Sequence, residues 1–176
     1  MLEGKNVNLR IVEKEDLPLL LEWRNSLEFE GRYNPVAVQQ SKTEFEKKYD
    51  SLGSEETRFL IEKKDGSKIG HIGTHLFGGM LEIGYAIAPN ERGHGYGTEA
   101  VKMMVDYLFM SRNIVRIGSA THVENRAAQK VLENAGFTRE GIERKGIFVW
   151  GKWTDLYVYS ILREEWKEPK ILTKTA

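Results

Sequence analysis

Residues 92–98 hold the part of the sequence best suited to chemistry, because an arginine, glycines and a threonine alternate there with aromatic residues. Glycine lets the backbone approach a ligand without interference from a Cβ atom. An apolar run precedes this stretch and apolar residues at helical spacing follow it, which predicts a strand, a loop and a helix start. The unpaired N–H groups and dipole of that helix start favour an anion such as a diphosphate. The candidate ligands are Arg92, Gly93, His94, Gly95, Tyr96, Gly97 and Thr98.

Two other phosphate-binding motifs fit this stretch less well. A P-loop ends in Gly-Lys-Ser or Gly-Lys-Thr, whereas the predicted helix opens with Gly97, Thr98 and Glu99, which argues against a triphosphate hydrolase. Residues 95–100 match the dinucleotide pattern G-x-G-x-x-A, but that pattern directly follows its strand and opens a series of βαβ units. Residues 89–92 intervene here, and the preceding chain is typical of hairpins. A Rossmann-type nucleotide binder is therefore a minor alternative.

The pattern Arg-x-x-Gly-x-Gly after a strand resembles the GNAT superfamily of acyl-CoA N-acyltransferases. Residues 92–97 match that family's pyrophosphate loop, and residues 125–137 are similar to its Asn-x-x-Ala helix ending in Gly-Phe. The similarity covers most of the chain and points to the branch of ribosomal-protein N-terminal acetyltransferases and spermidine acetyltransferases. It implies acetyl-CoA as co-substrate and a primary amine, either a protein N-terminus or a small polyamine, as acceptor.

The resemblance also implies how the substrates lie. In the family, the strand at 82–88 splays from its neighbour at 116–122 and leaves backbone groups for the pantetheine arm and the thioester carbonyl. We expect these contacts from Ile87 and Ala88, with Asn125 and Ala128 on the opposite wall. Between Asn25 and Gln40 the irregular pattern predicts a loop with one helical turn. In the family the corresponding segment covers the acceptor pocket; the alternative is a polar surface loop without a ligand. The acceptor-binding candidates are Trp23, Glu28 and Tyr33.

Acetyl transfer needs an uncharged amine, a polarised carbonyl and a proton for the departing thiolate, and much of the rate comes from holding the substrates in line. Glu82 is the first candidate for the base, taking the proton directly or through water. His71 and His75 on the neighbouring strand are alternatives or structural residues. Tyr85 either orients water or fills the core. A polyamine acceptor would need several carboxylates, for which the candidates are Glu28, Glu30, Glu44 and Glu46.

The sequence differs from the family at the position of the general acid. Many relatives carry there, four residues before Gly-Phe, a tyrosine that protonates the thiolate, whereas this chain has Leu132. Leucine cannot donate a proton. The remaining candidates are Ser119, Asn125 and Tyr157, and solvent is another source. This difference motivates a second hypothesis, that the chain is a non-catalytic acyl-CoA-binding or sensing module.

Length and composition restrict the function classes further. A chain of 176 residues is the size of one domain, here 1–166, with a polar tail at 167–176 that we expect to fray. Lys+Arg and Asp+Glu both number 26, so we expect no nucleic-acid or membrane partner. The absence of cysteine excludes a thiol nucleophile, and the four histidines show no metal-ligand spacing. We expect a cytoplasmic protein and leave a homodimer open.

The pattern of elements predicts a mixed α/β (α+β) fold, with a largely antiparallel central sheet of about seven strands flanked by about four helices. Asp16 is the expected N-cap of the first helix, and Ser41 and Glu44 have capping-box spacing before another. The predicted strands are 7–12, 57–63, 68–76, 82–88, 116–122, 137–148 and 153–162. Turns are expected at residues 65–66 and 78–79, and a helix from Asn125 to Gly136.

Overall fold

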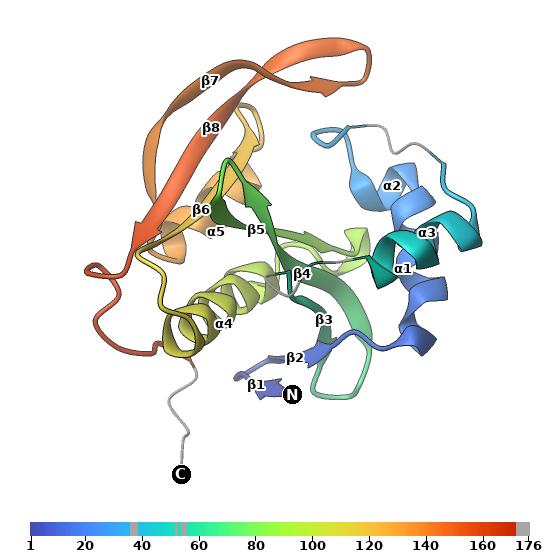
Figure 1. Cartoon of the computed structure of the whole chain (residues 1–176), viewed down its shortest axis with the longest axis horizontal. Coiled ribbons are helices and arrows are strands. Elements are labelled where there is room, and N and C mark those ends of the chain that lie inside the picture. The colour runs from blue at the N-terminus through green and yellow to red at the C-terminus, as the bar shows by residue number, and fades with distance from the viewer. Residues whose placement is uncertain (36–38, 52, 54–55, 172–176) are drawn as a thin grey trace.

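The computed structural model describes residues 1–35, 39–51, 53 and 56–171, and within them the chain forms one eight-stranded sheet with helices on both faces (Figure 1). The strand order is β1-β2-β3-β4-β5-β6-β8-β7. Neighbouring strands are antiparallel except for β5 and β6, which are parallel. The strands are β1 (Leu2–Glu3), β2 (Val7–Ile11), β3 (Arg58–Lys63), β4 (Lys68–Phe77), β5 (Met80–Ile87), β6 (Arg116–His122), β7 (Thr138–Val149) and β8 (Lys152–Leu162).

The helices confirm the predicted fold class, and the expected helical turn in the acceptor-covering segment is α2. The short edge strand β1 is the one strand that the sequence analysis missed. No described helix is both long enough and apolar enough to cross a membrane. The α-helices are α1 (Leu17–Asn25), α2 (Leu27–Glu30), α3 (Lys42–Asp50), α4 (Tyr96–Ser111) and α5 (Arg126–Asn134), with 3-10 turns η1 (Lys14–Asp16) and η2 (Pro89–Glu91).

Strands β3, β4 and β5 form a meander joined by the two predicted turns. Gly66 lies at φ +86°, and Gly78 and Gly79 lie at φ +56° and +79°, a region that glycine enters without the steric cost of a Cβ atom. The chain therefore reaches residues 92–98 through antiparallel strands. The described residues contain one parallel unit, β5–α4–β6, and not the series of βαβ units that a Rossmann fold requires, so that alternative is wrong.

The core lies on both faces of the sheet, as β3 illustrates. Phe59 and Ile61 point toward α4, whereas Leu60 between them packs with Leu17 under α1 and α3. A strand buried on both faces reads as a continuous apolar run rather than as an alternation. Leu60 is fully buried, so its replacement by alanine should cost about 2–5 kcal/mol of folding free energy.

Both ends of the described chain are fastened to α4. The Glu99 carboxylate in its first turn accepts bonds of 2.7 Å from the backbone and side chain of Asn6. The buried Asp106 carboxylate accepts bonds from the Trp166 indole and from the backbone N–H groups of Lys170 and Ile171. The amides of residues 170–171 are thus bonded to a buried carboxylate, while the expected fraying of the tail stays a prediction; residues 172–176 lie outside the described residues.

Asp16 precedes α1 as predicted, but its side chain does not cap the helix. Its buried carboxylate instead accepts two bonds from Arg10 at 2.8 and 2.9 Å and one from Lys68 at 2.7 Å. These charge-assisted bonds, that of Arg10 above all, hold the pKa of Asp16 well below its usual range. Asp16 thus ties β2 and β4 to the start of α1.

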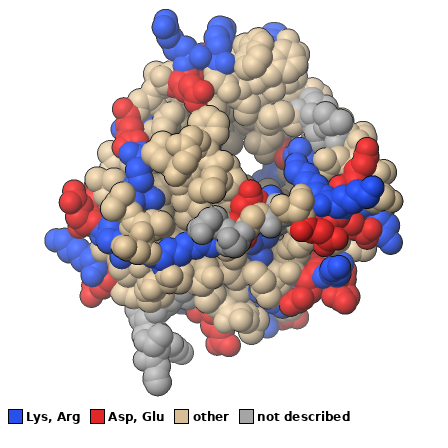
Figure 2. All heavy atoms as spheres, in the orientation of Figure 1, with Lys and Arg blue, Asp and Glu red and all other residues tan. Residues whose placement is uncertain are grey.

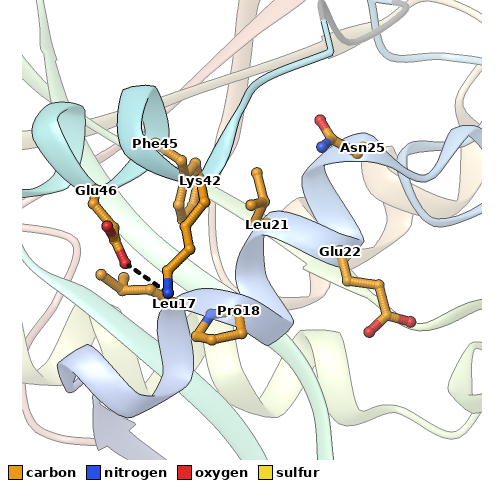
Figure 3. Close-up of a pocket in the computed structure, with 8 residues that line it drawn as sticks. All are labelled: Leu17, Pro18, Leu21, Glu22, Asn25, Lys42, Phe45 and Glu46. Atoms are coloured by element: carbon orange, nitrogen blue, oxygen red, sulfur yellow. Dashed lines mark ion pairs between the residues drawn. The ribbon is translucent and has the colours of Figure 1, made fainter.

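Helix α3 begins with the predicted capping box, in which Ser41 and Glu44 each accept from the other's backbone N–H. It packs on α1 and leaves between them a cavity of about 330 Å³ (Figure 3). Lys42 and Glu46 form an ion pair of 3.8 Å beside this cavity. Glu44 and Glu46, proposed from the sequence as polyamine ligands, are thus engaged on α3 itself.

Candidate active site

A cleft of about 990 Å³ lies where the glycine-rich loop, the facing edges of β5 and β6, the start of α5 and the α2 segment meet. In Figure 1, α2 and the β7–β8 hairpin stand on opposite sides of the β5–β6 junction. Figure 2 shows a hollow on this face between those two parts, with charges of both signs around it. Most of the predicted site residues line this one cleft.

The parallel strands β5 and β6 share a single register pair, Glu82↔Gly118. By contrast, β5 pairs with β4 along its full length. The two strands therefore part just beyond Glu82. At the parting point the buried Ser119 hydroxyl donates to the Ile83 carbonyl oxygen at 3.1 Å.

Backbone alternation decides which groups of β5 face the gap. Ala88 donates its N–H to the Ile69 carbonyl of the β4 side at 2.8 Å and accepts from the Glu91 N–H at 2.9 Å. Both backbone groups of Ala88 are therefore engaged within the protein, and its contact with the cofactor stays a prediction. Because successive residues of a strand alternate in direction, the backbone groups of Tyr85 and the N–H of Ile87 point toward β6 instead.

The glycine-rich loop ends in the N-terminus of α4. Gly93 and Gly95 both lie at φ +84°, and a Cβ atom added at either would meet open space. Gly95 is the N-cap and supplies no side-chain cap, so the N–H groups of Tyr96, Gly97 and Thr98 precede the first intrahelical bond, from Glu99 to Gly95. These amides open onto the cleft as an anion-binding site.

The Arg92 side chain is bonded to the backbone on two sides. Its Nε donates to the Ile87 carbonyl at 2.9 Å, and one terminal nitrogen donates to the Phe29 carbonyl at 2.7 Å. Two of its five N–H donors are thus engaged, and its contact with phosphate stays a prediction. Arg92 still lines the cleft.

The other loop side chains serve local packing. His94 is exposed, stacks on Tyr96 with ring centroids 5.6 Å apart and lies outside the cleft lining. Gly97 lies close to Tyr85, because a Cβ atom there would lie 3.3 Å from that ring, which would have to shift by a few tenths of an ångström. Thr98 lines the cleft at the helix start.

Helix α5 forms the opposite wall. Asn125 is its N-cap, and its side-chain oxygen accepts the Ala128 N–H at 3.2 Å. Asn125 and Ala128 both line the cleft, as does Leu132, whose side chain is 1% exposed. The helix ends at Asn134 with Ala135 as its C-cap, and Gly136 follows in the predicted C′ position at φ +97°.

The candidates for proton transfer lie in three different surroundings. Tyr85 lines the cleft, and burial raises its pKa well above the usual range, so its hydroxyl stays protonated. Glu82 lies outside the cleft lining, and its carboxylate is 3.2 Å from His75 Nε2 on the paired strand. Tyr157 lies under Arg139, with the guanidinium 4.5 Å from the ring centre, outside the cleft lining.

The α2 segment closes the acceptor side. Glu28 and Tyr33 line the cleft as predicted, whereas Trp23 lies behind α2 and stacks on Phe29 at 4.7 Å. His71 lies beside both rings, 6.4 Å from Trp23 and 6.0 Å from Phe29, and burial lowers its pKa to about 4. Trp23 therefore supports the wall and His71 remains neutral near pH 7.

Two further residues line the cleft: Glu30, which was among the polyamine candidates, and Trp150, which the sequence analysis missed. Glu30 lines the cleft, and burial raises its pKa although Arg24 lies 3.3 Å away. Trp150 lines the cleft from the β7–β8 turn, where its backbone lies at φ +49°. A tryptophan beside Gly151, between the predicted strands 137–148 and 153–162, was the available signal, since an aromatic side chain gains little by facing solvent.

Comparison with known proteins identifies the family of this arrangement. The family model for the acetyltransferase (GNAT) domain matches residues 6–138. Among curated relatives, the uncharacterized N-acetyltransferase YnaD of Bacillus subtilis is 37% identical over 100 residues, 56% of this chain and 59% of that protein. The putative ribosomal N-acetyltransferase YdaF of B. subtilis is 36% identical over 109 residues, 60% of each chain. The chain thus spans about three fifths of the length of these relatives.

Solved structures extend the likeness to nearly the whole chain. The spermidine N-acetyltransferase of Vibrio cholerae, in complex with CoA and spermine, has a TM-score of 0.81 at 25% identity, covering 92% of this chain and 98% of that one. RimJ of Mycobacterium smegmatis, in complex with CoA-disulfide, has a TM-score of 0.79 at 26% identity, covering 93% and 85%.

Proposed function

Because the chain belongs to the GNAT acetyltransferase family, we propose that it transfers the acetyl group of acetyl-CoA to a primary amine. The observation that carries the proposal is the uncapped N-terminus of α4, whose amides open onto a cleft beside two parting strands. The diphosphate of the cofactor binds these amides, and the pantetheine arm runs between β5 and β6. Backbone groups of Tyr85 and Ile87 pair with that arm.

In this reaction the amine nitrogen attacks the thioester carbon, a C–N bond forms and the C–S bond breaks. The amine loses one proton and the thiolate gains one. Glu82 accepts the amine proton through water, because its carboxylate lies outside the cleft lining, and His75 orients it. The rate depends mainly on holding the amine and the thioester in line.

The donor for the thiolate is a hydroxyl of the cleft or water. Leu132 has no proton to donate, and the Ser119 hydroxyl already donates its hydrogen bond to the Ile83 carbonyl oxygen. Tyr85 lines the cleft and keeps its proton, so it is the protein candidate for this role beside water, although burial also makes its hydroxyl a weaker acid. The alternative, a non-catalytic acyl-CoA-binding module, is favoured by the apolar side chain of Leu132 alone.

The acceptor end of the cleft supports a cationic amine. Glu28 and Glu30 supply carboxylates, and Trp150 supplies an aromatic face that attracts ammonium groups. The Tyr33 ring already carries the Arg32 guanidinium, 4.9 Å from its centre. The complex of the V. cholerae relative with spermine agrees with a polyamine, and the ribosomal name of YdaF with a peptide N-terminus. We place the reaction in the cytoplasm, where acetyl-CoA is available.

The test is turnover of acetyl-CoA by the purified chain with spermidine, spermine, alanyl peptides and amino sugars. Mass spectrometry of the acceptor and release of free thiol report the reaction. An acetylated amine with equal thiol release supports the enzyme. Tight binding of CoA with no product on any acceptor supports the binding module instead, and absence of CoA binding contradicts both.

A further inference from the structure

Arg92 joins two parts of the cleft that are far apart in the sequence. It directly precedes the loop whose amides we assign to the diphosphate. Its guanidinium bonds the end of β5 through Ile87 and reaches α2 through Phe29, 63 positions away. One side chain therefore connects the cofactor loop, the strand beside the thioester and the acceptor wall.

The acceptor wall, residues 27–34, is also held by the Arg24–Glu30 ion pair of 3.3 Å and by the Tyr33 ring, 5.1 Å from His122. Ser26 caps α2 by accepting the Phe29 N–H at 3.2 Å, and the chain reverses at Gly31, which lies at φ +75°. A Cβ atom at Gly31 would lie 3.7 Å from an Arg92 terminal nitrogen, so the guanidinium lies against the turn itself. Phe29 anchors the wall from behind, whereas Arg92 holds it from the cofactor side.

We propose that Arg92 is a positioning residue that sets the acceptor wall relative to the cofactor loop. This inference rests on the proposed function. The planar guanidinium reaches two carbonyl oxygens in fixed directions, which a lysine ammonium on a flexible stem does not reproduce. Arg92 therefore acts through geometry, and its positive charge toward the cofactor is secondary.

The test compares Arg92→Lys, which keeps the charge, with Lys130→Ala, which removes a positive charge from the opposite wall of the cleft. Hydrogen exchange of the Glu30 and Gly31 amides, bonded to Ser26 and Leu27, reports the α2 wall without any ligand. Calorimetry with CoA gives its Kd. Steady-state kinetics with spermidine, or with an alanyl peptide if spermidine is not accepted, give the acceptor KM and kcat.

In Arg92→Lys we expect faster exchange at Glu30 and Gly31, a CoA Kd within about threefold of wild type and an acceptor KM raised about tenfold. Lys130→Ala should leave α2 exchange unchanged. Wild-type exchange and acceptor KM in Arg92→Lys would overturn the inference, as would a loss confined to CoA affinity. A wild-type chain that binds no CoA would refute the proposed function, while the exchange comparison would still decide the role of Arg92.

Discussion

The Ser119 hydroxyl donates to the Ile83 carbonyl at 3.1 Å, at the point where β5 and β6 separate. This bond replaces the backbone pairing that ends at Glu82 and Gly118. Ser119 therefore shapes the opening of the cleft, although the sequence suggested it as a proton donor. Its hydroxyl is buried, so the bond is shielded from competition by water.

Ser119→Ala should destabilise the fold by about 1–2 kcal/mol, because it leaves the Ile83 carbonyl without this partner. The effect on kcat should stay below about tenfold, since the proton of Ser119 is committed to that carbonyl. Urea unfolding and steady-state kinetics check the two values. A loss of kcat by about a thousandfold with normal stability would instead support Ser119 as the acid.

Glu82→Gln should lower kcat/KM by about a hundredfold or more if Glu82 is the base. The deficit should shrink as pH rises, because more of the acceptor then arrives uncharged. The measurement is kcat/KM from about pH 6 to about pH 10 for wild type, Glu82→Gln and the control His75→Gln, which removes only the partner of the carboxylate. A constant ratio of Glu82→Gln to wild type across this range would exclude Glu82 as the base.

Asp16→Asn should destabilise the protein by about 2–3 kcal/mol at neutral pH, because Arg10 and Lys68 lose a buried anionic partner. The pKa of Asp16 is lowered in the folded state, so its contribution is present above the unfolded pKa near 3.8 and is lost as pH falls below it. Urea unfolding should show the difference from wild type shrinking between about pH 4 and about pH 2. A difference that does not depend on pH would contradict the ion-pair explanation.

His71 should remain neutral down to about pH 5, because burial lowers its pKa to about 4 from 6.5. Between pH 6.5 and pH 4 the unfolded chain binds a proton on His71 and the folded chain does not. The free energy of unfolding is therefore highest above pH 6.5 and falls as pH decreases toward 4. NMR titration of the imidazole carbons measures the pKa directly. His71→Phe keeps an aromatic ring against Trp23 and should reduce the pH dependence of stability in that range; a pKa of His71 at or above 6.5 would contradict this burial.

The sequence predicted the elements well wherever a local pattern determined them. Gly66, Gly78 and Gly79 marked real turns, and Ser41 and Glu44 a real capping box, because each depends on a few adjacent residues. Asp16 looked like an N-cap by the same local rule. Its charged partners on β2 and β4 come from elsewhere in the sheet, and only the fold brings them together.

The site was predictable as a loop but not as a set of side-chain directions. The glycine spacing of residues 93–97 identified the loop without the structure. The spacing could not show that Arg92 turns back to Phe29, or that Ala88 pairs with β4 while Tyr85 faces the gap. Both depend on tertiary register. Trp150 was missed because the turn that brings it to the cleft belongs to a hairpin remote in sequence from the loop.

The most direct test of the central claim is calorimetric titration of CoA into wild type, Gly95→Asp and Gly95→Asn. Aspartate and asparagine both tolerate the left-handed conformation at φ +84°, and a Cβ atom at position 95 would meet open space, so both variants should fold. Only aspartate places a negative charge among the amides of the α4 N-terminus. We predict that Gly95→Asp weakens CoA binding by about a hundredfold or more while Gly95→Asn stays within about tenfold of wild type. Equal, wild-type affinity in both variants would contradict binding of the diphosphate at this loop.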